Sequence, residues 1–296
     1  MNKTPIYLNV SNLRNRIDSF TLENITFKLG KGEVALIGGK NSSGKTSLLE
    51  TLCFVNMPDE GNLVFLGKKV FDSGLKKKNW RETKKYIGVQ FQGDSLFNNL
   101  TVWETFQLFS KNHGLEEIPK IVISCPFLQG FMDKRISKLS KGKVQLIKFL
   151  LSVMHGPKIV LLDEPVSNLD GDTRSWVHET IKKMKSNGTS FLITMNNLWS
   201  IGGISNRLIT IEEGSLYRIY DNFHEYYKGC TAKLSSDFNI NDIQEKDWVL
   251  GIEKRKDYYL LYSNLNVSRL LERKELPLLS IGEIMIEDFY PGGDGR

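Results

Sequence analysis

Cysteine is scarce in this chain of 296 residues, which has three widely separated cysteines, Cys53, Cys125 and Cys230. Their spacing suits neither a disulfide framework nor a set of metal ligands, so we expect reduced, partly buried thiols of a cytosolic protein. No stretch approaches the ~18–20 continuous apolar residues that a membrane-spanning helix needs. The N-terminal residues also lack the apolar core of a signal peptide. These absences favour a cytoplasmic chain.

Internal repeats and long low-complexity segments are also missing. The hydrophobic fraction of 40% is ample for a core, and the length permits one large domain or one domain plus a small one. The net charge of +6 is concentrated in residues 68–85, which hold eight basic and two acidic side chains. A solvated loop is the plainer interpretation of this basic segment, and proximity to an anionic membrane surface is the alternative that we favour over nucleic acid.

The most informative stretch lies between an apolar run at 33–37, which predicts a buried strand, and a helix start at 47–52. From Gly39 to Thr46 it fits G-x-x-x-x-G-K-[ST], the P-loop pattern, rather than an ordinary strand–turn–helix. The glycines let several N–H groups point into one concavity, and the helix N-terminus adds partial positive charge. Lys45 supplies a full charge to the β- and γ-phosphates, and Thr46 offers its hydroxyl to Mg²⁺.

The whole loop is therefore expected to bind nucleotide, and its members are Gly39, Lys40, Asn41, Ser42, Ser43, Gly44, Lys45, Thr46 and Ser47. A second apolar run, at 158–162, delivers two carboxylates, Asp163 and Glu164. In an open α/β sheet, ligands bind at the carboxyl ends of the strands. We expect Asp163 to hold Mg²⁺ through water and Glu164 to polarise an attacking water.

Strands and helices alternate around these motifs, which predicts an α/β fold. We expect strands at 6–13, 20–29, 86–92, 189–194, 207–211 and 216–219, and a hairpin at 62–67 and 68–71. Residues 101–151 are predicted to be largely helical, with a capping box at Thr101 and Glu104 and an interruption at 139–143. Further helices are expected from Val144 to about His155 and over 172–186.

The sequence changes character beyond residue 221. We expect a polar, linker-like segment at 235–247, strands at 248–252 and 258–262, an amphipathic helix at 266–276 and a frayed tail at 292–296. Residues 232–296 are predicted to form a small α/β appendage.

With both phosphate motifs in place, residues 6–220 resemble the ATP-binding cassette (ABC) ATPases, because further motifs follow in the family's order. Gln92 resembles the Q-loop glutamine, which in the family reaches Mg²⁺, and 97–104 resembles the segment after it. Residues 167–170, ending in Asp170, resemble the D-loop. After Leu139, the residues that resemble the LSGGQ signature are Ser140, Lys141, Gly142 and Lys143.

The resemblance implies an ABC ATP-binding domain at 1–220, with a P-loop α/β core, an antiparallel β subdomain and an inserted helical subdomain at about 93–155. A linker and a small accessory domain would then occupy 221–296. It also implies an ATPase that uses ATP and Mg²⁺, with Glu164 as the catalytic residue. Family members form head-to-tail dimers in which the P-loop of one subunit and the signature of the other sandwich ATP. Hydrolysis removes the shared γ-phosphate and releases the clamp.

Three features depart from the family pattern. Lys141 and Lys143 replace a glycine and the glutamine of the signature, where a lysine either neutralises phosphate or blocks close approach. Met195 stands where a switch histidine is expected, and methionine cannot donate a hydrogen bond to the γ-phosphate as an imidazole can. The aromatic residue that stacks on adenine is not obvious, since Ile17 falls near its place and Phe20 is the nearest aromatic. Nucleotide binding is therefore better supported than fast hydrolysis.

The resemblance favours the cytoplasmic ATPase subunit of a multi-subunit ABC transporter, peripheral at the inner face of the membrane. Its partners would be a separate membrane permease and a second ABC subunit, identical or not. Residues 286–289 resemble an ending found in such subunits, and an exporter of peptide, antibiotic or lipid fits the appendage. The alternatives are a soluble ABC ATPase in cluster assembly or nucleic-acid work, and a catalytically weak ATP-dependent regulator. Nucleic acid is not favoured, because 94 positions between Lys45 and Leu139 leave no room for a long coiled coil.

Overall fold

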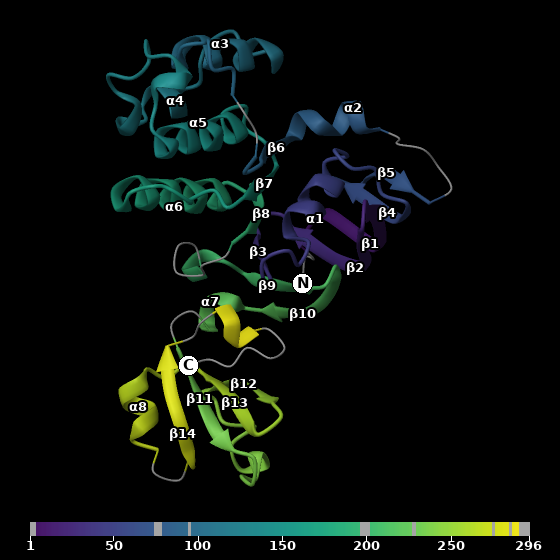
Figure 1. Cartoon of the computed structure of the whole chain (residues 1–296), viewed down its shortest axis with the longest axis vertical. Helices are drawn as coiled ribbons and strands as arrows, with labels where there is room; N and C mark the ends of the chain where they lie inside the picture. The colour runs from purple at the N-terminus through teal and green to yellow at the C-terminus, as the bar shows by residue number, and fades with distance from the viewer. Residues whose placement is uncertain are drawn as a thin grey trace.

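The computed structural model describes residues 4–73, 79–93, 96–195, 202–226, 229–273, 276–283 and 286–289. One ten-stranded sheet, in the order β5-β4-β1-β2-β10-β9-β3-β8-β7-β6, runs through the centre of the molecule (Figure 1). A smaller four-stranded sheet, β12-β13-β11-β14, lies at the opposite end from helices α3 and α4. None of the helices in the described ranges is long and apolar enough to cross a membrane.

Antiparallel strands form one half of the large sheet: β1 (Ile6–Ile17), β2 (Phe20–Gly30), β4 (Glu60–Phe65) and β5 (Lys68–Asp72). In β2 the buried side chains of Ile25, Phe27 and Leu29 alternate with exposed ones, as in a strand with one face in the core. Both β1 and β2 reach beyond the predicted bounds, and Ile17 opposes Phe20 at the turn between them. Register shifts along β1 account for the imperfect periodicity of its sequence.

The other half of the sheet is parallel and contains β9 (Arg207–Glu212), β3 (Val34–Gly38), β8 (Ser190–Thr194), β7 (Ile159–Asp163) and β6 (Ile87–Gln90). Strand β10 (Ser215–Asp221) connects the two halves, because it pairs with β9 and with β2. Every residue of β3, β7 and β8 is buried, as expected for parallel strands covered on both faces. The carboxyl ends of these strands therefore meet at one edge of the sheet.

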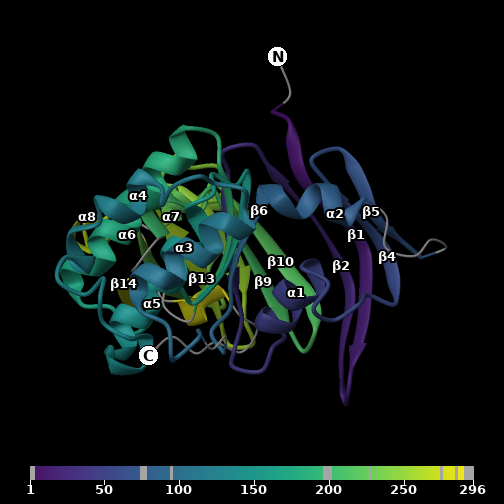
Figure 2. The same ribbon diagram turned by 90° about the horizontal axis from the view of Figure 1, so that it is seen from above.

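Helices cover both faces of the parallel strands (Figure 2). Helix α1 (Lys45–Leu52) covers one face, α5 (Lys141–Val153) and α6 (Gly171–Ser186) cover the other, and the fourth of the longer helices, α3 (Val102–Asn112), lies beyond α5 (Figure 1). The shorter ones are α2 (Trp80–Thr83), α4 (Lys120–Ile123) and α7 (Phe223–Tyr226). Val34 and Leu36 of β3 belong to the core that includes α5 and α6, whereas Ala35 and Ile37 belong to the core that includes α1.

The helical region between β6 and β7 begins with the predicted capping box. Glu104 donates its N–H to the Thr101 hydroxyl at 3.1 Å, and its carboxylate accepts the Thr101 N–H at 2.8 Å. The prediction for α5 was wrong at its start, because the helix begins at Lys141 and not at Val144. Ser140 is the N-cap and accepts the Lys143 N–H through its hydroxyl at 3.4 Å, so the signature residues form the first helical turn.

The second sheet contains β11 (Cys230–Ser235), β12 (Val249–Lys254), β13 (Tyr258–Ser263) and β14 (Leu278–Glu283). The predicted strands at 248–252 and 258–262 are β12 and β13, whereas β11 and β14 were not predicted. The helix expected at 266–276 is shorter, as α8 (Val267–Leu271), with Asn266 as its N-cap. The tail expected at 292–296 lies outside the described residues.

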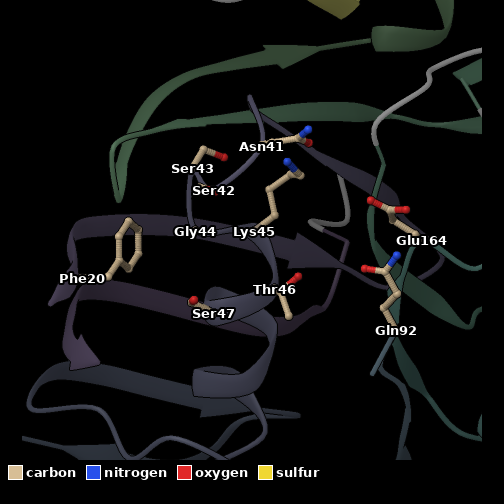
Figure 3. A pocket seen from close by; sticks show the side chains of 10 residues that line it. All are labelled: Phe20, Asn41, Ser42, Ser43, Gly44, Lys45, Thr46, Ser47, Gln92 and Glu164. Atoms are coloured by element: carbon tan, nitrogen blue, oxygen red, sulfur yellow. The ribbon is translucent and has the colours of Figure 1, made fainter. Parts of the chain in front are cut away.

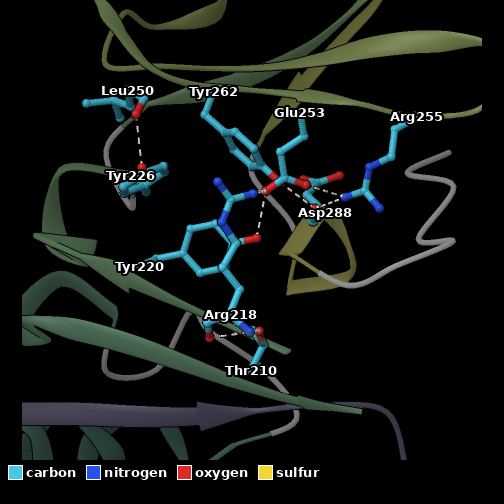
Figure 4. Close-up of polar contacts among 9 residues, drawn as sticks. All are labelled: Thr210, Arg218, Tyr220, Tyr226, Leu250, Glu253, Arg255, Tyr262 and Asp288. Atoms are coloured by element: carbon cyan, nitrogen blue, oxygen red, sulfur yellow. Dashed lines mark hydrogen bonds and ion pairs between the residues drawn. The ribbon is translucent and has the colours of Figure 1, made fainter. Parts of the chain in front are cut away.

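An aromatic cluster and an ion cluster around the buried carboxylate of Glu253 join the small sheet to β10, and Figure 4 shows the polar contacts of the ion cluster. The aromatic cluster contains Tyr220, Phe223, Tyr226, Tyr262 and Phe289. In the ion cluster, the Glu253 carboxylate accepts hydrogen bonds from Arg218 at 2.7 Å, from the Tyr220 hydroxyl at 2.7 Å and from Arg255 at 3.0 Å.

The residues 286–289 form a short 3-10 helix, and its backbone takes part in the same junction. Arg255 donates to the carbonyl of Asp288 at 2.6 Å, and the Tyr262 hydroxyl donates to the same oxygen. The ring of Phe289 is fully buried in the aromatic cluster. The C-terminal segment therefore contributes to the packing between the two sheets.

Candidate functional site

The residues from Gly39 to Ser47 form the loop between β3 and α1, together with the first turn of that helix. A cavity of about 550 Å³ opens over this loop and is lined by Phe20, Asn41, Ser42, Ser43, Gly44, Lys45, Thr46, Ser47, Gln92 and Glu164 (Figure 3). Gly44 has φ 106°, and a Cβ atom there would lie 2.7 Å from the ring of Phe20. The loop therefore requires glycine at this position for both its conformation and its space.

Lys45 is anchored within the loop that carries it. Its ammonium donates hydrogen bonds to the carbonyls of Gly39 at 2.7 Å and of Lys40 at 2.9 Å. Burial lowers the pKa of Lys45, while the nearby Glu164 and Asp163 carboxylates act in the opposite direction. A buried cation at a helix N-terminus, beside open backbone amides, is suited to a polyphosphate.

Asp163 lies at the carboxyl end of β7 and is 2% exposed. One of its carboxylate oxygens accepts a hydrogen bond from the Thr46 hydroxyl at 2.9 Å, and the other accepts one from the Thr194 hydroxyl. The donor set of one hydroxyl and one carboxylate, next to a phosphate-binding loop, fits Mg²⁺, which prefers oxygen ligands. Gln92 lines the same cavity, so the structure brings the three expected metal-site residues to one place.

Glu164 follows directly and also lines the cavity. Figure 3 shows Glu164 and Gln92 at one end of the cavity, Phe20 at the other, and Lys45 between them. An extended nucleotide that lies over the loop would thus have an aromatic ring at one end and a carboxylate at the other. This arrangement suits stacking of a base at Phe20 and chemistry on a terminal phosphate near Glu164.

Phe20 rather than Ile17 is the aromatic candidate for the base. In the sequence, Ile17 falls near the expected position and Phe20 is only the nearest aromatic residue, so the motif alone did not settle which residue stacks on the base. The missing signal was the length of the β1–β2 hairpin, which brings Phe20 over Gly44 through pairing with Ile17.

The signature residues lie at a separate cavity of about 380 Å³, lined by Ser140, Lys141, Gly142, Lys143, Asn168, Leu169, Asp170 and Thr173. This cavity shares no lining residue with the one over the P-loop. Asp170 caps α6, since its carboxylate accepts the Thr173 N–H at 2.8 Å, and this bond lowers the pKa of Asp170. The separation of the two cavities is compatible with a signature that serves the nucleotide of a second subunit.

The two lysines of the signature point in different ways. The Lys143 ammonium donates to the carbonyl of Phe127 at 2.8 Å and lies 4.9 Å from the ring centre of Phe131. The Lys143 ammonium therefore contacts groups of the helical region itself. Lys141 is exposed at the first turn of α5.

Met195 packs into the protein core. Its side chain is 3% exposed and belongs to the apolar cluster beneath α5 and α6, and its N–H donates to the Ile37 carbonyl at 3.2 Å. It does not contribute to the lining of the cavity over the P-loop. Asn196, the next residue, lies outside the described residues.

The described part of the basic segment is partly neutralised by acidic neighbours. Lys68 pairs with Glu82 at 2.6 Å, and Lys69 pairs with Asp72 at 2.6 Å. The first pair is exposed and the second is partly exposed, so both contribute little to stability. Residues 74–78, which include the three consecutive lysines of this segment, lie outside the described residues.

The α/β sheet, the P-loop and the carboxylates at the end of β7 define a P-loop ATPase of the ATP-binding cassette class. A family model described as "ABC transporter" matches residues 22–167. The chain is 31% identical to the lipoprotein-releasing system ATP-binding protein LolD 1 of Chlorobium luteolum, over 63% of this chain and 83% of that protein. The chain therefore belongs to the ABC transporter family, as an ATP-binding subunit with ATPase activity.

A further relative and two solved structures are also similar to the chain, and the solved structures show the same fold. The chain is 26% identical to the spermidine/putrescine import ATP-binding protein PotA of Spiroplasma citri, over 84% of this chain and 73% of that protein. The structure of an ATP-binding subunit of an ABC transporter superposes with a TM-score of 0.65 and 19% identity, covering 73% of this chain and 90% of that chain. A dimeric cassette in a post-hydrolysis state with ADP and Pi superposes with a TM-score of 0.63 and 20% identity, and the match covers 72% of this chain and 98% of that chain. The predicted fold class is confirmed by these matches.

Proposed function

We propose that this chain is the cytoplasmic ATPase subunit of a multi-subunit ABC transporter, which dimerises head to tail on ATP and drives a separate membrane permease. The observation that carries the proposal is that Lys45, Thr46 and Glu164 line one cavity, with Asp163 hydrogen-bonded to Thr46. The separate signature cavity supports a dimer in which each subunit completes the nucleotide site of the other. The second subunit is either a copy of this chain or a related cassette.

In this proposal the P-loop amides, the N-terminus of α1 and Lys45 bind the phosphates of ATP and hold them in line for attack. Thr46, Asp163 and Gln92 would hold Mg²⁺, which supplies charge neutralisation at the phosphates. Glu164 accepts a proton from the attacking water, and Phe20 stacks on the adenine. Ser140, Lys141 and the backbone of Gly142 act on the nucleotide of the partner.

The named relatives differ in the substrates that they transport. Their names describe import of polyamines and of phosphonates, and release of lipoproteins. The C-terminal sheet and the segment 286–289 favour an exporter of peptide, antibiotic or lipid, as the sequence resemblance suggested. Under this proposal the protein is peripheral at the inner face of the membrane, next to its permease.

Glu164→Gln tests the proposed chemistry. Glutamine keeps the shape of the side chain but cannot accept the proton, and general-base catalysis is worth ~10²–10⁴-fold in rate. We expect ATP binding to be retained, turnover to fall by that factor, and a dimer to accumulate in size-exclusion chromatography with Mg-ATP. Wild-type turnover in this variant would show that Glu164 is not the base.

A further inference from the structure

Glu164 has a backbone conformation that is uncommon for a residue with a side chain, with φ 46°. Such a conformation persists where the surrounding structure fixes it. On one side, the Glu164 N–H donates to the carbonyl and to the hydroxyl of Thr194, each at 3.2 Å. Strand β8 therefore holds the amide side of this residue.

On the other side, the carbonyl of Glu164 accepts three hydrogen bonds. Ser167 donates to it through its hydroxyl at 2.9 Å and its N–H at 3.1 Å. Gln145 donates to it through Nε2 at 2.9 Å. Ser167 belongs to the turn that follows Glu164, whereas Gln145 belongs to α5, so Gln145 joins Glu164 to a different element.

Helix α5 contacts the site region at two further points. A Cβ atom on Gly142 would lie 2.6 Å from the carbonyl oxygen of Asn168, so the helix approaches the 164–170 segment closely. One turn beyond Gln145, the Lys148 ammonium donates to the carbonyl of Gln92 at 3.3 Å. Gln145 itself is 6% exposed, so water does not compete freely for its amide. A displacement of α5 would therefore be transmitted to the backbone of Glu164.

We propose that Gln145 is a positioning residue for hydrolysis, which fixes the backbone of Glu164 from α5 and makes turnover depend on the position of that helix. The proposal rests on the proposed role of Glu164 as the general base. Gln145 does not line the P-loop cavity, so it acts through Glu164 and not on ATP. Because the first turn of α5 carries the signature, Gln145 also connects the nucleotide of the partner to the base of this subunit.

Gln145→Met is the main test, since methionine has a similar length and no hydrogen-bond donor. We expect kcat to fall on the order of 10–100-fold, because small displacements of a catalytic group cost this much in rate. The dissociation constant for ATP, measured by titration of a fluorescent analogue, should change by less than about twofold. A purely structural defect would instead lower the melting temperature or the number of ATP-binding sites per chain, and kcat and ATP binding would then be lost together.

Two other variants provide a control and a second test. Gln107→Met removes an exposed glutamine from α3 and should leave turnover at the wild-type level. Gln145→Asn keeps the amide but is one methylene too short, so it should reproduce the loss of kcat even if the methionine variant does not fold. Wild-type kcat in a folded Gln145→Met or Gln145→Asn protein would overturn the proposal.

A double variant separates this inference from the proposed function. If Gln145 acts through Glu164, Gln145→Met should slow single turnover by less than about twofold in a Glu164→Gln background, because coupled residues are not additive. The same fold loss in both backgrounds would overturn the inference. Wild-type turnover of Glu164→Gln alone would overturn the base assignment, whereas an inactive Glu164→Gln with a fully active Gln145→Met would overturn only the role of Gln145.

Discussion

Lys45 combines a full charge with burial and with anchoring to the carbonyls of its own loop. Its replacement by alanine removes a charged donor from the phosphates, which costs on the order of 1.5–3 kcal/mol. We expect Lys45→Ala to weaken ATP binding by roughly 10–150-fold in a titration with labelled ATP. Lys28→Ala, which removes an exposed lysine of β2, is the matched control and should bind normally. Unchanged affinity in Lys45→Ala would contradict the P-loop assignment.

Met195 provides no donor to the cavity, because its thioether packs in the core. We expect slow ATP turnover for the isolated protein, since removal of one donor to developing charge costs ~10²–10³-fold in other enzymes. Met195→His should raise kcat by about tenfold or more, because an imidazole, unlike a thioether, can donate a hydrogen bond to a phosphate oxygen.

Met195→Leu is the control for this position, since leucine keeps the apolar packing without adding a donor. Its turnover should remain slow. If the wild-type protein alone is a fast ATPase, and Met195→His adds nothing, the role assigned to this position is wrong. A partner cassette with an intact signature should raise the rate of the wild-type protein without any substitution.

At the scale of single residues, the motifs that lie within one short segment could be predicted, because the residues of the P-loop and of the end of β7 largely determine the local backbone conformation themselves. The Thr46–Asp163 contact joins two such motifs, and parallel pairing places both at one sheet edge. Phe20 and Gln145 were not predictable in the same way. The position of Phe20 depends on the length of the β1–β2 hairpin, and that of Gln145 depends on how α5 packs against the 164–170 segment. Neither property can be predicted from a short sequence motif.

At the scale of secondary-structure elements, two imidazoles stack just beyond the C-terminal ends of helices α3 and α5. The rings of His113 and His155 lie 4.0 Å apart with an interplanar angle of 12°. Burial, and secondarily the neighbouring His113, lowers the pKa of His155 from 6.5 to about 4. Between these two pH values, His155 is therefore mostly neutral in the folded protein and mostly protonated in the unfolded chain.

This difference predicts an acid-sensitive contact. Between pH 6.5 and about 4, unfolded His155 binds a proton that folded His155 does not, so stability falls as the pH is lowered through this window. His155→Phe keeps a stacked ring and removes the titration. Its melting temperature should therefore decline less than that of the wild type between pH 6.5 and 4.5 in calorimetry. Parallel curves for the two proteins would show that the stack is not the source of acid sensitivity.

The elements themselves were predicted unevenly for physical reasons. Buried parallel strands such as β7 and β8 give continuous apolar runs with clear ends. The start of α5 was misplaced, because a lysine–glycine–lysine turn does not suggest a helix until Ser140 is seen to cap it. Strand β11 was missed because it is the centre of a sheet formed with segments that follow it by 20 residues or more, such as β13 and β14.

At the scale of the whole molecule, β10 connects the nucleotide-binding sheet to the C-terminal sheet. Its turn lies against the P-loop, where the Gly214 N–H donates to the Ser43 carbonyl at 3.0 Å. Further along, its residues Arg218 and Tyr220 both contact Glu253 of β12 (Figure 4). The two sheets are therefore joined by directed contacts as well as by aromatic packing.

Glu253 is the centre of this junction and is 9% exposed. Burial of Tyr220 raises the pKa of its hydroxyl, and the hydrogen bond to Glu253 and the negative charge of that carboxylate raise this pKa further, so the tyrosine remains a hydrogen-bond donor at neutral pH. Glu253→Gln keeps the shape of the side chain but removes the negative charge that Arg218 and Arg255 contact, and breaking a buried pair costs about 3–5 kcal/mol. Since a domain is stable by only ~5–15 kcal/mol, a loss of this size is a large fraction of the stability of a domain.

We therefore expect Glu253→Gln to loosen the C-terminal sheet from β10 while the P-loop continues to bind ATP. Hydrogen exchange should become faster in β12, in β13 and in residues 286–289, because these segments share the contacts of Glu253, Tyr262 and Asp288. Glu245→Gln, which changes an exposed acid of the same region, should exchange as the wild type does. Equal exchange rates in Glu253→Gln and Glu245→Gln would mean that aromatic packing alone holds the two sheets together.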